Sequence, residues 1–161
     1  MQKQALGVDI GNVIINNRLN DLKKLDEKGY ANLPVMEGSF EGLKILNDHF
    51  NGEVYLISKC TEWAEAQILA WLHAHDFFSK TKIDEKHIYF VRERHEKDAV
   101  CRKLGITHFI DDRLEVLSHM IDSTPNLYLF VPDTGEVEQF REFLSKATTV
   151  NSWQEAVAKI M

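Results

Sequence analysis

The sequence predicts an α/β fold of the Rossmann-like, doubly wound type, with a parallel sheet of about five strands and helices on both of its faces. Two observations lead to this prediction. Short apolar runs alternate with longer segments of helical periodicity along the chain, and parallel neighbouring strands need a crossover element between them. No Pro-, Gly- or Ser-rich linker divides the 161 residues, so we expect a single domain over 1–161.

The expected strands are short and rich in Val, Ile, Leu, Phe and Tyr. Such continuous apolar runs are typical of strands that are buried on both faces. The strands are expected at 5–10, 54–57, 87–91, 108–110 and 126–131.

Helical periodicity with start and stop signals fills the gaps between these strands. Helices are expected at 40–50, 62–74, 97–104, 114–121, 136–144 and 153–160. Ser39 and Thr61 are candidate N-caps of the first two helices, and Gly105 closes the third. Ser152 and Glu155 form a capping box ahead of the last helix.

One segment breaks the alternation of strands and helices. Between the first strand and the helix after Ser39, residues 15–38 contain an extra polar stretch at 20–29 that has some helical character. The segment is too short for a domain and too long for a simple turn. We therefore expect it to lie as a small lid over the edge of the sheet.

Charge and cysteine content limit the partners of the protein. Asp and Glu number 25 and Lys and Arg 19, a net charge of −6, which disfavours broad attraction to nucleic acid or to an anionic membrane surface. Two cysteines, Cys60 and Cys101, are too few for a disulfide scaffold. The apolar run near the N-terminus is too short for a signal peptide or a membrane helix. We expect a cytoplasmic protein without a nucleic-acid or membrane partner.

Charged and hydroxyl side chains follow the predicted strands where each strand ends. In an open α/β sheet, ligands bind outside the carboxyl ends of the strands. The residues at these ends are Asp9; Ser58 and Lys59; Arg92 and Arg94, which lead to Lys97; and Asp111, Asp112 and Arg113.

This set of residue types suits a divalent cation beside a phosphate group. Mg²⁺ prefers oxygen ligands and often shares them with a substrate phosphate, and Asp9 and Asp112 can supply carboxylates. Ser58 and Lys97 can hold phosphoryl oxygens. Asp9, facing the phosphorus, can attack it and form an aspartyl phosphate.

Four motifs in this order resemble those of the haloacid dehalogenase (HAD) superfamily over most of the chain. Residues 5–13 are similar to the first motif, a hydrophobic strand ending in a nucleophilic Asp, and 54–58 to the second, a strand ending in a phosphate-binding Ser or Thr. Lys97, which opens a helix, resembles the third motif, and 109–112 the fourth. By the same resemblance, residues 15–38 stand where some members carry a cap, here in a very reduced form.

The resemblance implies an Mg²⁺-dependent hydrolase that acts on a small phosphorylated molecule. It implies that Asp9 is the nucleophile and also a metal ligand. Ser58 and Lys97 would bind phosphate, with Asp112 as the inner-sphere metal ligand and Asp111 as the outer one.

One position departs from the pattern of the family's phosphatases. Those enzymes carry a second Asp two residues after the nucleophile, which protonates the leaving group and later activates water, whereas this chain has Gly11. The Gly11 carbonyl can still bind a metal. Loss of a general acid or base costs about 10²–10⁴-fold in rate, so ordinary phosphomonoesters are expected to be poor substrates.

Three functional hypotheses follow. The first is a weakened phosphatase-like hydrolase that prefers substrates with good leaving groups, such as acyl or aryl phosphates. The second is a degenerate binding or regulatory module that holds Mg²⁺ and phosphate without turnover. The third, a metal-free enzyme that attacks carbon as dehalogenases do, is disfavoured by the acid pair Asp111 and Asp112.

Several basic residues have alternative assignments. Lys59, Arg92 or Arg94 can take the phosphate-binding role of Lys97. Together with Arg113, they are also candidates for contacting the rest of the substrate.

Each motif residue also has a purely structural interpretation. Asp9 can be a turn residue, Ser58 a capping serine and Lys97 a solvated helix lysine. Asp111 and Asp112 can pair with Arg113, although adjacent acids repel each other and a cation would offset that repulsion.

Cys60 lies near the proposed cleft. It is expected to be a small, partly buried residue rather than a reactive thiol.

Overall fold

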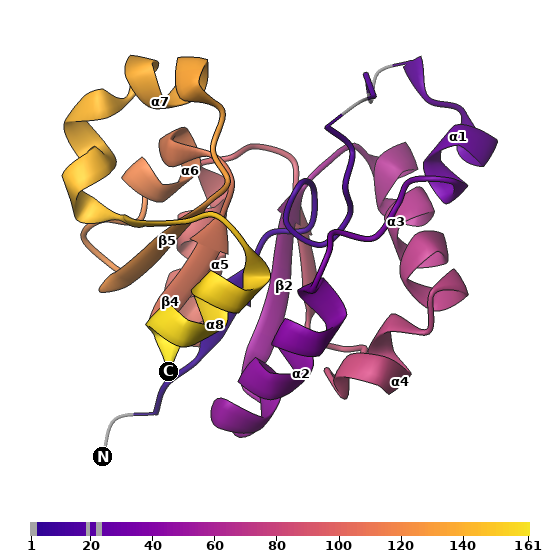
Figure 1. The fold of residues 1–161 in the computed structure, drawn as a ribbon, viewed down its shortest axis with the longest axis horizontal. Coiled ribbons are helices and arrows are strands. Elements are labelled where there is room, and N and C mark those ends of the chain that lie inside the picture. Colours follow the sequence, from indigo (N-terminus) through magenta and orange to yellow (C-terminus); the bar gives the residue numbers. More distant parts are fainter. Residues whose placement is uncertain (1–2, 19, 22–23) are drawn as a thin grey trace.

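The computed structural model of the chain describes residues 3–18, 20–21 and 24–161. Its strands form one fully parallel sheet in the order β3-β2-β1-β4-β5-β6 (Figure 1). The Rossmann-like α/β prediction is therefore confirmed. The strands are β1 Leu6–Val8, β2 Val54–Lys59, β3 Ile88–Val91, β4 His108–Asp111, β5 Asn126–Phe130 and β6 Thr148–Val150.

The sheet has six strands rather than about five. The additional strand, β6, lies at the edge and pairs only with β5. Of its three residues only Val150 is buried, while Thr148 and Thr149 are exposed. So short an edge strand has no apolar run, which is the signal that predicted the others.

Helices cover both faces of the sheet and enclose two hydrophobic clusters. On one face lie α2 Ser39–His49, α3 Glu62–Ala74, α4 Phe77–Thr81 and α8 Trp153–Ile160, whose apolar side chains share a cluster with β1 and β2. The opposite face is covered by α5 Glu96–Leu104, α6 Leu114–Ser118, α7 Thr134–Gln139 and a 3-10 helix at Arg141–Lys146. Figure 1 shows α2 and α8 side by side on the first face.

Two of the three predicted N-caps are confirmed. The Thr61 hydroxyl accepts a hydrogen bond from the Ala64 amide, and the Ser152 hydroxyl from the Glu155 amide. The prediction for Ser39 was wrong, because the helix already includes it and the cap position is Gly38, at φ 78°.

Other helix boundaries also differ from the prediction. The pattern at 114–121 becomes helix only as far as Ser118, and the pattern at 136–144 is divided between α7 and the 3-10 helix. The short α4 had not been predicted. Among the described residues, no helix is long and apolar enough to cross a membrane.

The chain makes a tight turn directly after β1. The Ile10 carbonyl accepts hydrogen bonds from the amides of Val13, Ile14 and Ile15. Asn12 has a φ of 60°, a left-handed conformation that Asn tolerates better than most residues. The turn brings the chain back beside itself, so that Gly11 forms a bridge with Ile15.

The insertion at 15–38 starts and ends as a paired ribbon. Ile15 bridges Val35, and the Met36 amide donates to the Ile14 carbonyl. Between these ends lies α1 Glu27–Ala31, which packs on α3. Within this contact the rings of Tyr30 and Trp63 meet edge to face, with centroids 6.1 Å apart.

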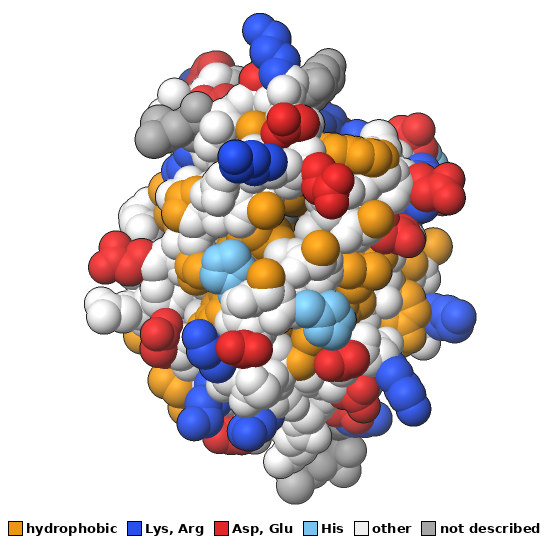
Figure 2. Space-filling model, turned by 90° about the vertical axis from the view of Figure 1, so that its right-hand side faces the viewer, with side chains coloured by type: hydrophobic (Ala, Val, Ile, Leu, Met, Phe, Trp, Pro, Cys, Tyr) orange, Lys and Arg blue, Asp and Glu red, His pale blue; other side chains and the backbone are white. Residues whose placement is uncertain are grey.

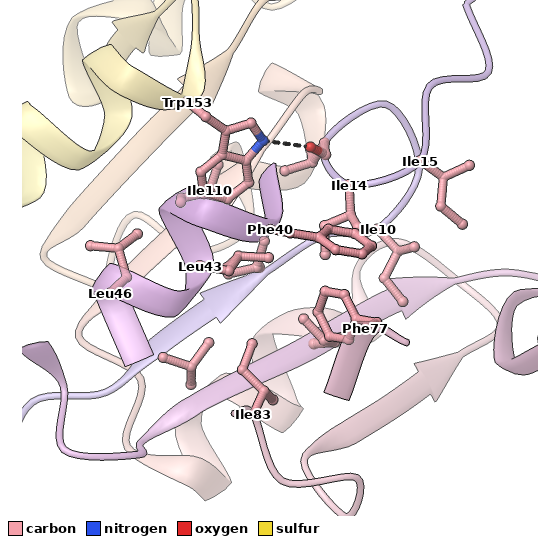
Figure 3. Packing of buried hydrophobic residues seen from close by; sticks show 14 of the residues in the cluster. Ile10, Ile14, Ile15, Phe40, Leu43, Leu46, Phe77, Ile83, Ile110 and Trp153 are labelled. Carbon is pink, nitrogen blue, oxygen red and sulfur yellow. Dashed lines mark hydrogen bonds between the residues drawn. The ribbon is translucent and has the colours of Figure 1, made fainter. Parts of the chain in front are cut away.

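Two buried tryptophans fix the backbone of this region. Trp153 of α8 donates from its indole nitrogen to the Val13 carbonyl at 2.7 Å (Figure 3). Trp71 of α3 donates in the same way to the Leu33 carbonyl at 2.8 Å. Helices far along the chain therefore hold both the turn after β1 and the end of the insertion.

Candidate active site

The strand order creates a switch point at the carboxyl edge of the sheet, the place where open α/β sheets bind ligands in a crevice. β1 pairs with β2 on one side and with β4 on the other. The chain adds β2 and β3 on one side of β1 and then continues with β4 on the other side, so the switch point lies between β1 and β4. Asp9 follows β1, and its amide donates to the Ile110 carbonyl of β4 at 3.0 Å. Asp111 is the last residue of β4. Two of the predicted site residues thus meet at this crevice.

Lys97 joins these two carboxylates. From the first turn of α5, its Nζ lies 3.0 Å from Asp9 Oδ1 and 2.8 Å from Asp111 Oδ2. Lys97 is only 2% exposed, which excludes the interpretation as a solvated helix lysine. A buried ammonium needs partners of opposite charge, and the two aspartates supply them. Although burial favours the neutral amine, Asp111 and Asp9 outweigh it and raise the pKa of Lys97.

Three carboxylates are crowded around this lysine. One oxygen each from Asp9, Asp111 and Asp112 lies within 4.8 Å of the others. Burial, with the Asp111 charge adding to it, raises the pKa of Asp9 to about 6 even though Lys97 opposes the shift. Burial and the charges of Asp111 and Asp9 also raise the pKa of Asp112 well above its usual value.

The two neighbouring acids have different surroundings. Asp111 is fully buried, and both of its oxygens are engaged, one by Lys97 Nζ and the other by the Arg113 amide at 3.0 Å. Asp112 is partly exposed. Asp112 therefore has the more available oxygens for a ligand in the crevice.

The charges of the cluster fit a hard divalent cation. Three carboxyl groups and one lysine share the cluster. Burial and the charge of neighbouring carboxylates raise the pKa values of Asp9 and Asp112, and Lys97 does not fully offset this. Oxygen ligands of this kind suit Mg²⁺. Asp9 and Asp112 are the residues that would hold it.

Gly11 lies in the turn next to Asp9. Its backbone does not have positive φ. Apart from its chain neighbours, the only atom of the described residues within 4 Å of a β-carbon at this position is Nδ2 of Asn17, at 3.6 Å, an ordinary contact distance. Neither backbone strain nor lack of space therefore requires glycine here.

Ser58 and Lys59 are the last residues of β2, so they lie at the strand end as predicted, although the strand itself extends two residues beyond the expected 54–57. Ser58 is buried and Lys59 is exposed, and successive side chains of a strand point to opposite faces. Lys59 lines a cavity of about 290 Å³ together with Arg94, Glu115 and His119. It therefore faces the side of the sheet that α5 and α6 cover.

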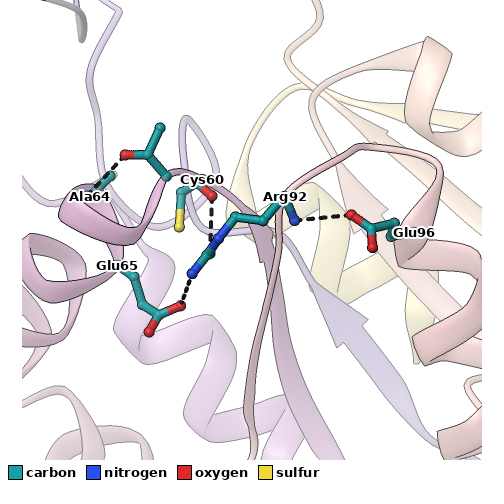
Figure 4. Close-up of polar contacts among 6 residues, drawn as sticks. Cys60, Ala64, Glu65, Arg92 and Glu96 are labelled. Carbon is teal, nitrogen blue, oxygen red and sulfur yellow. Dashed lines mark hydrogen bonds and ion pairs between the residues drawn. The ribbon is translucent and has the colours of Figure 1, made fainter.

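The three arginines have different surroundings. The guanidinium of Arg92 is already engaged, with Nη1 donating to the Cys60 carbonyl and Nη2 to Glu65, both at 3.1 Å (Figure 4). Arg94 pairs with Glu115 of α6 at 3.5 Å.

Arg113 contributes its amide to Asp111. Its buried Nε has no hydrogen-bond partner among the described residues. The pairing of Asp111 with Arg113 is thus a backbone contact.

Cys60 does not have the surroundings of a reactive thiol. It is half-buried, and burial raises the pKa of its thiol to about 11, although Arg92 opposes the shift. A thiolate is the nucleophilic form of cysteine, and this pKa keeps the thiol protonated at neutral pH. Its interpretation as a partly buried packing residue is supported.

Sequence reasoning missed two polar residues near the motifs. Glu136 of α7 is buried, and its carboxylate accepts hydrogen bonds from the amides of Leu114 and Glu115 at the start of α6, directly after the acid pair. Asn17 is also buried, at 6% exposure, beside Gly11. Neither belongs to a local pattern, so only the fold identifies them.

A larger hollow of about 450 Å³ lies apart from the carboxylates. It is lined by residues before and within α2, including Val35, Met36 and Phe40, and by His75 and Lys80 beyond them. Figure 2 shows the face of the molecule on the side of α1, α3 and α4, where apolar side chains surround histidine side chains. No motif residue lines this hollow.

Comparison with known proteins shows similarity in fold only. No family model and no curated protein sequence matches the chain. Solved structures match along nearly its whole length. One is an HAD family hydrolase from Deinococcus radiodurans with bound phosphate and sodium, with 13% identity, a TM-score of 0.67 and coverage of 98% of this chain and 94% of that one.

A D,D-heptose bisphosphate phosphatase from B. bronchiseptica, complexed with magnesium and phosphate, matches with 12% identity and a TM-score of 0.64, over 98% of this chain and 97% of that one. The corresponding phosphatase from Burkholderia thailandensis matches with 11% identity and a TM-score of 0.60, over 98% of both chains. The chain therefore has the fold of HAD-type hydrolases.

Proposed function

We propose that this chain is a member of the HAD superfamily that acts as an Mg²⁺-dependent hydrolase on a small phosphorylated compound, with Asp9 as its nucleophile. One observation carries the proposal: Lys97 joins Asp9 and Asp111 inside a buried carboxylate cluster at the switch point of the sheet. Burial of charged groups is unfavourable. A site for a metal ion and a phosphate group explains why Lys97 and the three aspartates are buried together. The fold shared with phosphate-bound hydrolases supports the same function.

In this proposal the metal is held by Asp9, Asp112 and the Gly11 carbonyl. Asp111, whose oxygens are already engaged, orients Lys97 and acts as an outer ligand. Bound Mg²⁺ would neutralise carboxylate charge and polarise a phosphoryl oxygen. The Ser58 hydroxyl and the Lys97 ammonium would bind oxygens of the phosphoryl group.

The geometry of Asp9 suits nucleophilic attack. Lys97 holds Oδ1, which fixes the carboxylate plane and leaves the second oxygen to attack phosphorus. As the new bond forms, the bond from phosphorus to the leaving group breaks, and the leaving group departs with the electron pair. Water then hydrolyses the aspartyl phosphate to regenerate Asp9 and release phosphate.

Gly11 determines which leaving groups are accepted. It carries no acid to protonate the departing oxygen, so substrates that leave readily as anions are favoured. Acyl phosphates and aryl phosphates are the expected class. Lys59 and Arg94, which line the neighbouring cavity, would contact the rest of the substrate. Arg92 and Arg113 remain weaker candidates, because Arg92 is already bound to Cys60 and Glu65.

Turnover of acetyl phosphate and p-nitrophenyl phosphate tests the proposal. Both should be hydrolysed in Mg²⁺ but not in EDTA, and Asp9→Asn should abolish the activity. Glu41→Gln, an exposed site on α2, is the matched control and should retain it. Negligible turnover of both compounds by the wild type would count against an enzyme.

A second candidate is a regulatory module that retains Mg²⁺ and phosphate without turnover. Gly11 favours it as well, since the missing base would also slow hydrolysis of an aspartyl phosphate. Mass spectrometry after treatment with acetyl phosphate separates the two candidates. A persistent phosphoryl adduct on Asp9 without continued release of phosphate supports the module.

A further inference from the structure

Asn17 has a buried polar side chain beside the candidate nucleophile. Only 6% of the residue is exposed. In the part of the chain that the structure describes, and apart from the neighbours of Gly11 in sequence, its Nδ2 is the one atom within 4 Å of the position where any other residue at 11 would carry its β-carbon. No described residue forms a hydrogen bond with the Asn17 side-chain amide, and its polar atoms are not among the fully buried ones that lack a partner. Among the described residues, the amide therefore has no hydrogen-bond partner, and it lies next to Gly11 in the turn that follows Asp9.

The backbone holds Asn17 firmly in this place. Its own amide donates to Asn12 Oδ1 at 3.1 Å, and the adjoining Asn16 amide donates to the Pro34 carbonyl at 2.9 Å. On its other side Arg18 reaches across the edge of the sheet, with Nη2 donating to the Val131 carbonyl at 2.8 Å. Because three contacts fix the segment, the free amide is positioned before any ligand arrives.

We propose that the side-chain amide of Asn17 donates a hydrogen bond to the leaving-group oxygen of a substrate whose phosphorus faces Asp9. The inference rests on the proposed function and deepens it, since it names the group that faces the leaving oxygen. A donor that has no partner among the described residues and lies beside the nucleophile's turn is placed to stabilise charge that develops during reaction. Asn17 then compensates in part for the missing acid at position 11.

The chemistry of an amide limits what Asn17 does. It donates a hydrogen bond but does not release its proton at neutral pH, so the leaving oxygen departs as an anion and is protonated later by water. Rates should therefore depend steeply on how well the leaving group carries negative charge. Removal of the amide should lower the rate most for substrates with poor leaving groups, because their leaving oxygens depend most on the hydrogen bond.

Two phosphate mimics separate this role from general phosphate binding. Orthovanadate places an oxygen at the leaving-group position, whereas beryllium fluoride on an aspartate mimics the phosphoryl group without that oxygen. With the full chain in Mg²⁺, Asn17→Ala should weaken vanadate binding about 10- to 100-fold, the worth of a hydrogen bond to a charged group. Binding of beryllium fluoride should remain as in the wild type.

A kinetic experiment compares aryl phosphates whose leaving groups differ in pKa. Asn17→Ala should lower kcat/KM more for phenyl phosphate than for p-nitrophenyl phosphate. Asn20→Ala, at an exposed position in the same segment, is the matched control and should match the wild type in every measurement. Unfolding midpoints of both variants confirm that they are folded.

The outcomes distinguish failure of the proposed hydrolase function from failure of the proposed role of Asn17. A wild type that binds neither mimic and turns over no phosphate overturns the proposed function together with this inference. A wild type that binds both, with an Asn17→Ala variant equal to it in vanadate binding and in leaving-group dependence, overturns the inference alone. Equal weakening of both mimics would also overturn it, because Asn17 would then hold the phosphoryl group itself.

Discussion

The indole nitrogen of Trp153 donates a hydrogen bond to the Val13 carbonyl, 140 residues earlier in the chain. Val13 belongs to the turn that leads away from Asp9, so the last helix of the protein supports the backbone of the candidate nucleophile. The ring packs closely against α2, because a β-carbon at Gly42 would come within 2.9 Å of it. This contact connects the stability of the fold to the geometry of the site.

Trp153→Phe tests this connection. Phenylalanine keeps an apolar ring but removes the donor, which leaves the buried Val13 carbonyl without this partner. The expected loss of unfolding free energy is about 1–3 kcal/mol, measured by urea denaturation. Trp63→Phe is the matched control, since Trp63 is 46% exposed and surface changes stay within about 0.5 kcal/mol. Equal losses in both variants would contradict the special role of Trp153.

Local patterns predicted most of the fold, and their limits are physical. The helix at 62–74 was predicted with its true ends because Thr61 caps it and its periodicity is regular. β6 and α4 were missed because a short edge strand and a single helical turn carry too few residues to form a pattern. The Trp153–Val13 contact has no local signal, since it depends on how the last helix packs.

Gly7 in the centre of the sheet provides a second test of stability. A β-carbon there would lie 2.5 Å from Phe109 Cδ2 in the neighbouring strand β4, and Phe109 is fully buried. Gly7→Ala should therefore destabilise the protein by about 1–3 kcal/mol through overpacking. Gly11→Ala is the control, because the nearest atom to its β-carbon is 3.6 Å away, and it should change the unfolding midpoint little. If Gly7→Ala left the free energy of unfolding unchanged, β1 and β4 would have to move apart at little energetic cost.

The carboxylate cluster predicts an unusual pH dependence. Burial and Asp111 raise the pKa of Asp9 from 3.8 to about 6. Between these two pH values, Asp9 is mostly protonated in the folded protein and mostly ionised in the unfolded chain. Ionisation of Asp9 therefore costs the folded state on the order of 3 kcal/mol above pH 6, and this cost disappears as the pH falls towards 4. In EDTA, Asp9→Asn should be more stable than the wild type at about pH 7–8 and nearly equal to it near pH 4.

Urea unfolding of both proteins across this pH range measures the difference. Added Mg²⁺ should reduce the difference by stabilising only the wild type. Asp48→Asn, an exposed position of α2, should show a difference that does not depend on pH. A gap between Asp9→Asn and wild type that grows as the pH falls would contradict the sign of the Asp9 pKa shift.

The candidate site was predictable as far as it follows from topology. Carboxyl ends of neighbouring parallel strands meet at one edge, which is why Asp9 and Asp111 lie close together although they are far apart in sequence. The place of Asn17 follows instead from the path of the insertion, and Glu136 reaches Leu114 across 22 residues. The contact of Arg92 with Glu65 likewise depends on the fold, which brings α3 close to the residue that follows β3.

Restoring an acid at position 11 tests whether the rest of the site is intact. The structure has room for a side chain there, so Gly11→Asp should fold. It should increase turnover of phenyl phosphate by about 10²–10⁴-fold, the worth of general acid-base catalysis, while acetyl phosphate, whose leaving group needs no proton, should change little. Gly11→Asn has the same shape without the acid and should give no gain. Equal rates for the two variants would mean that the site lacks more than the proton donor.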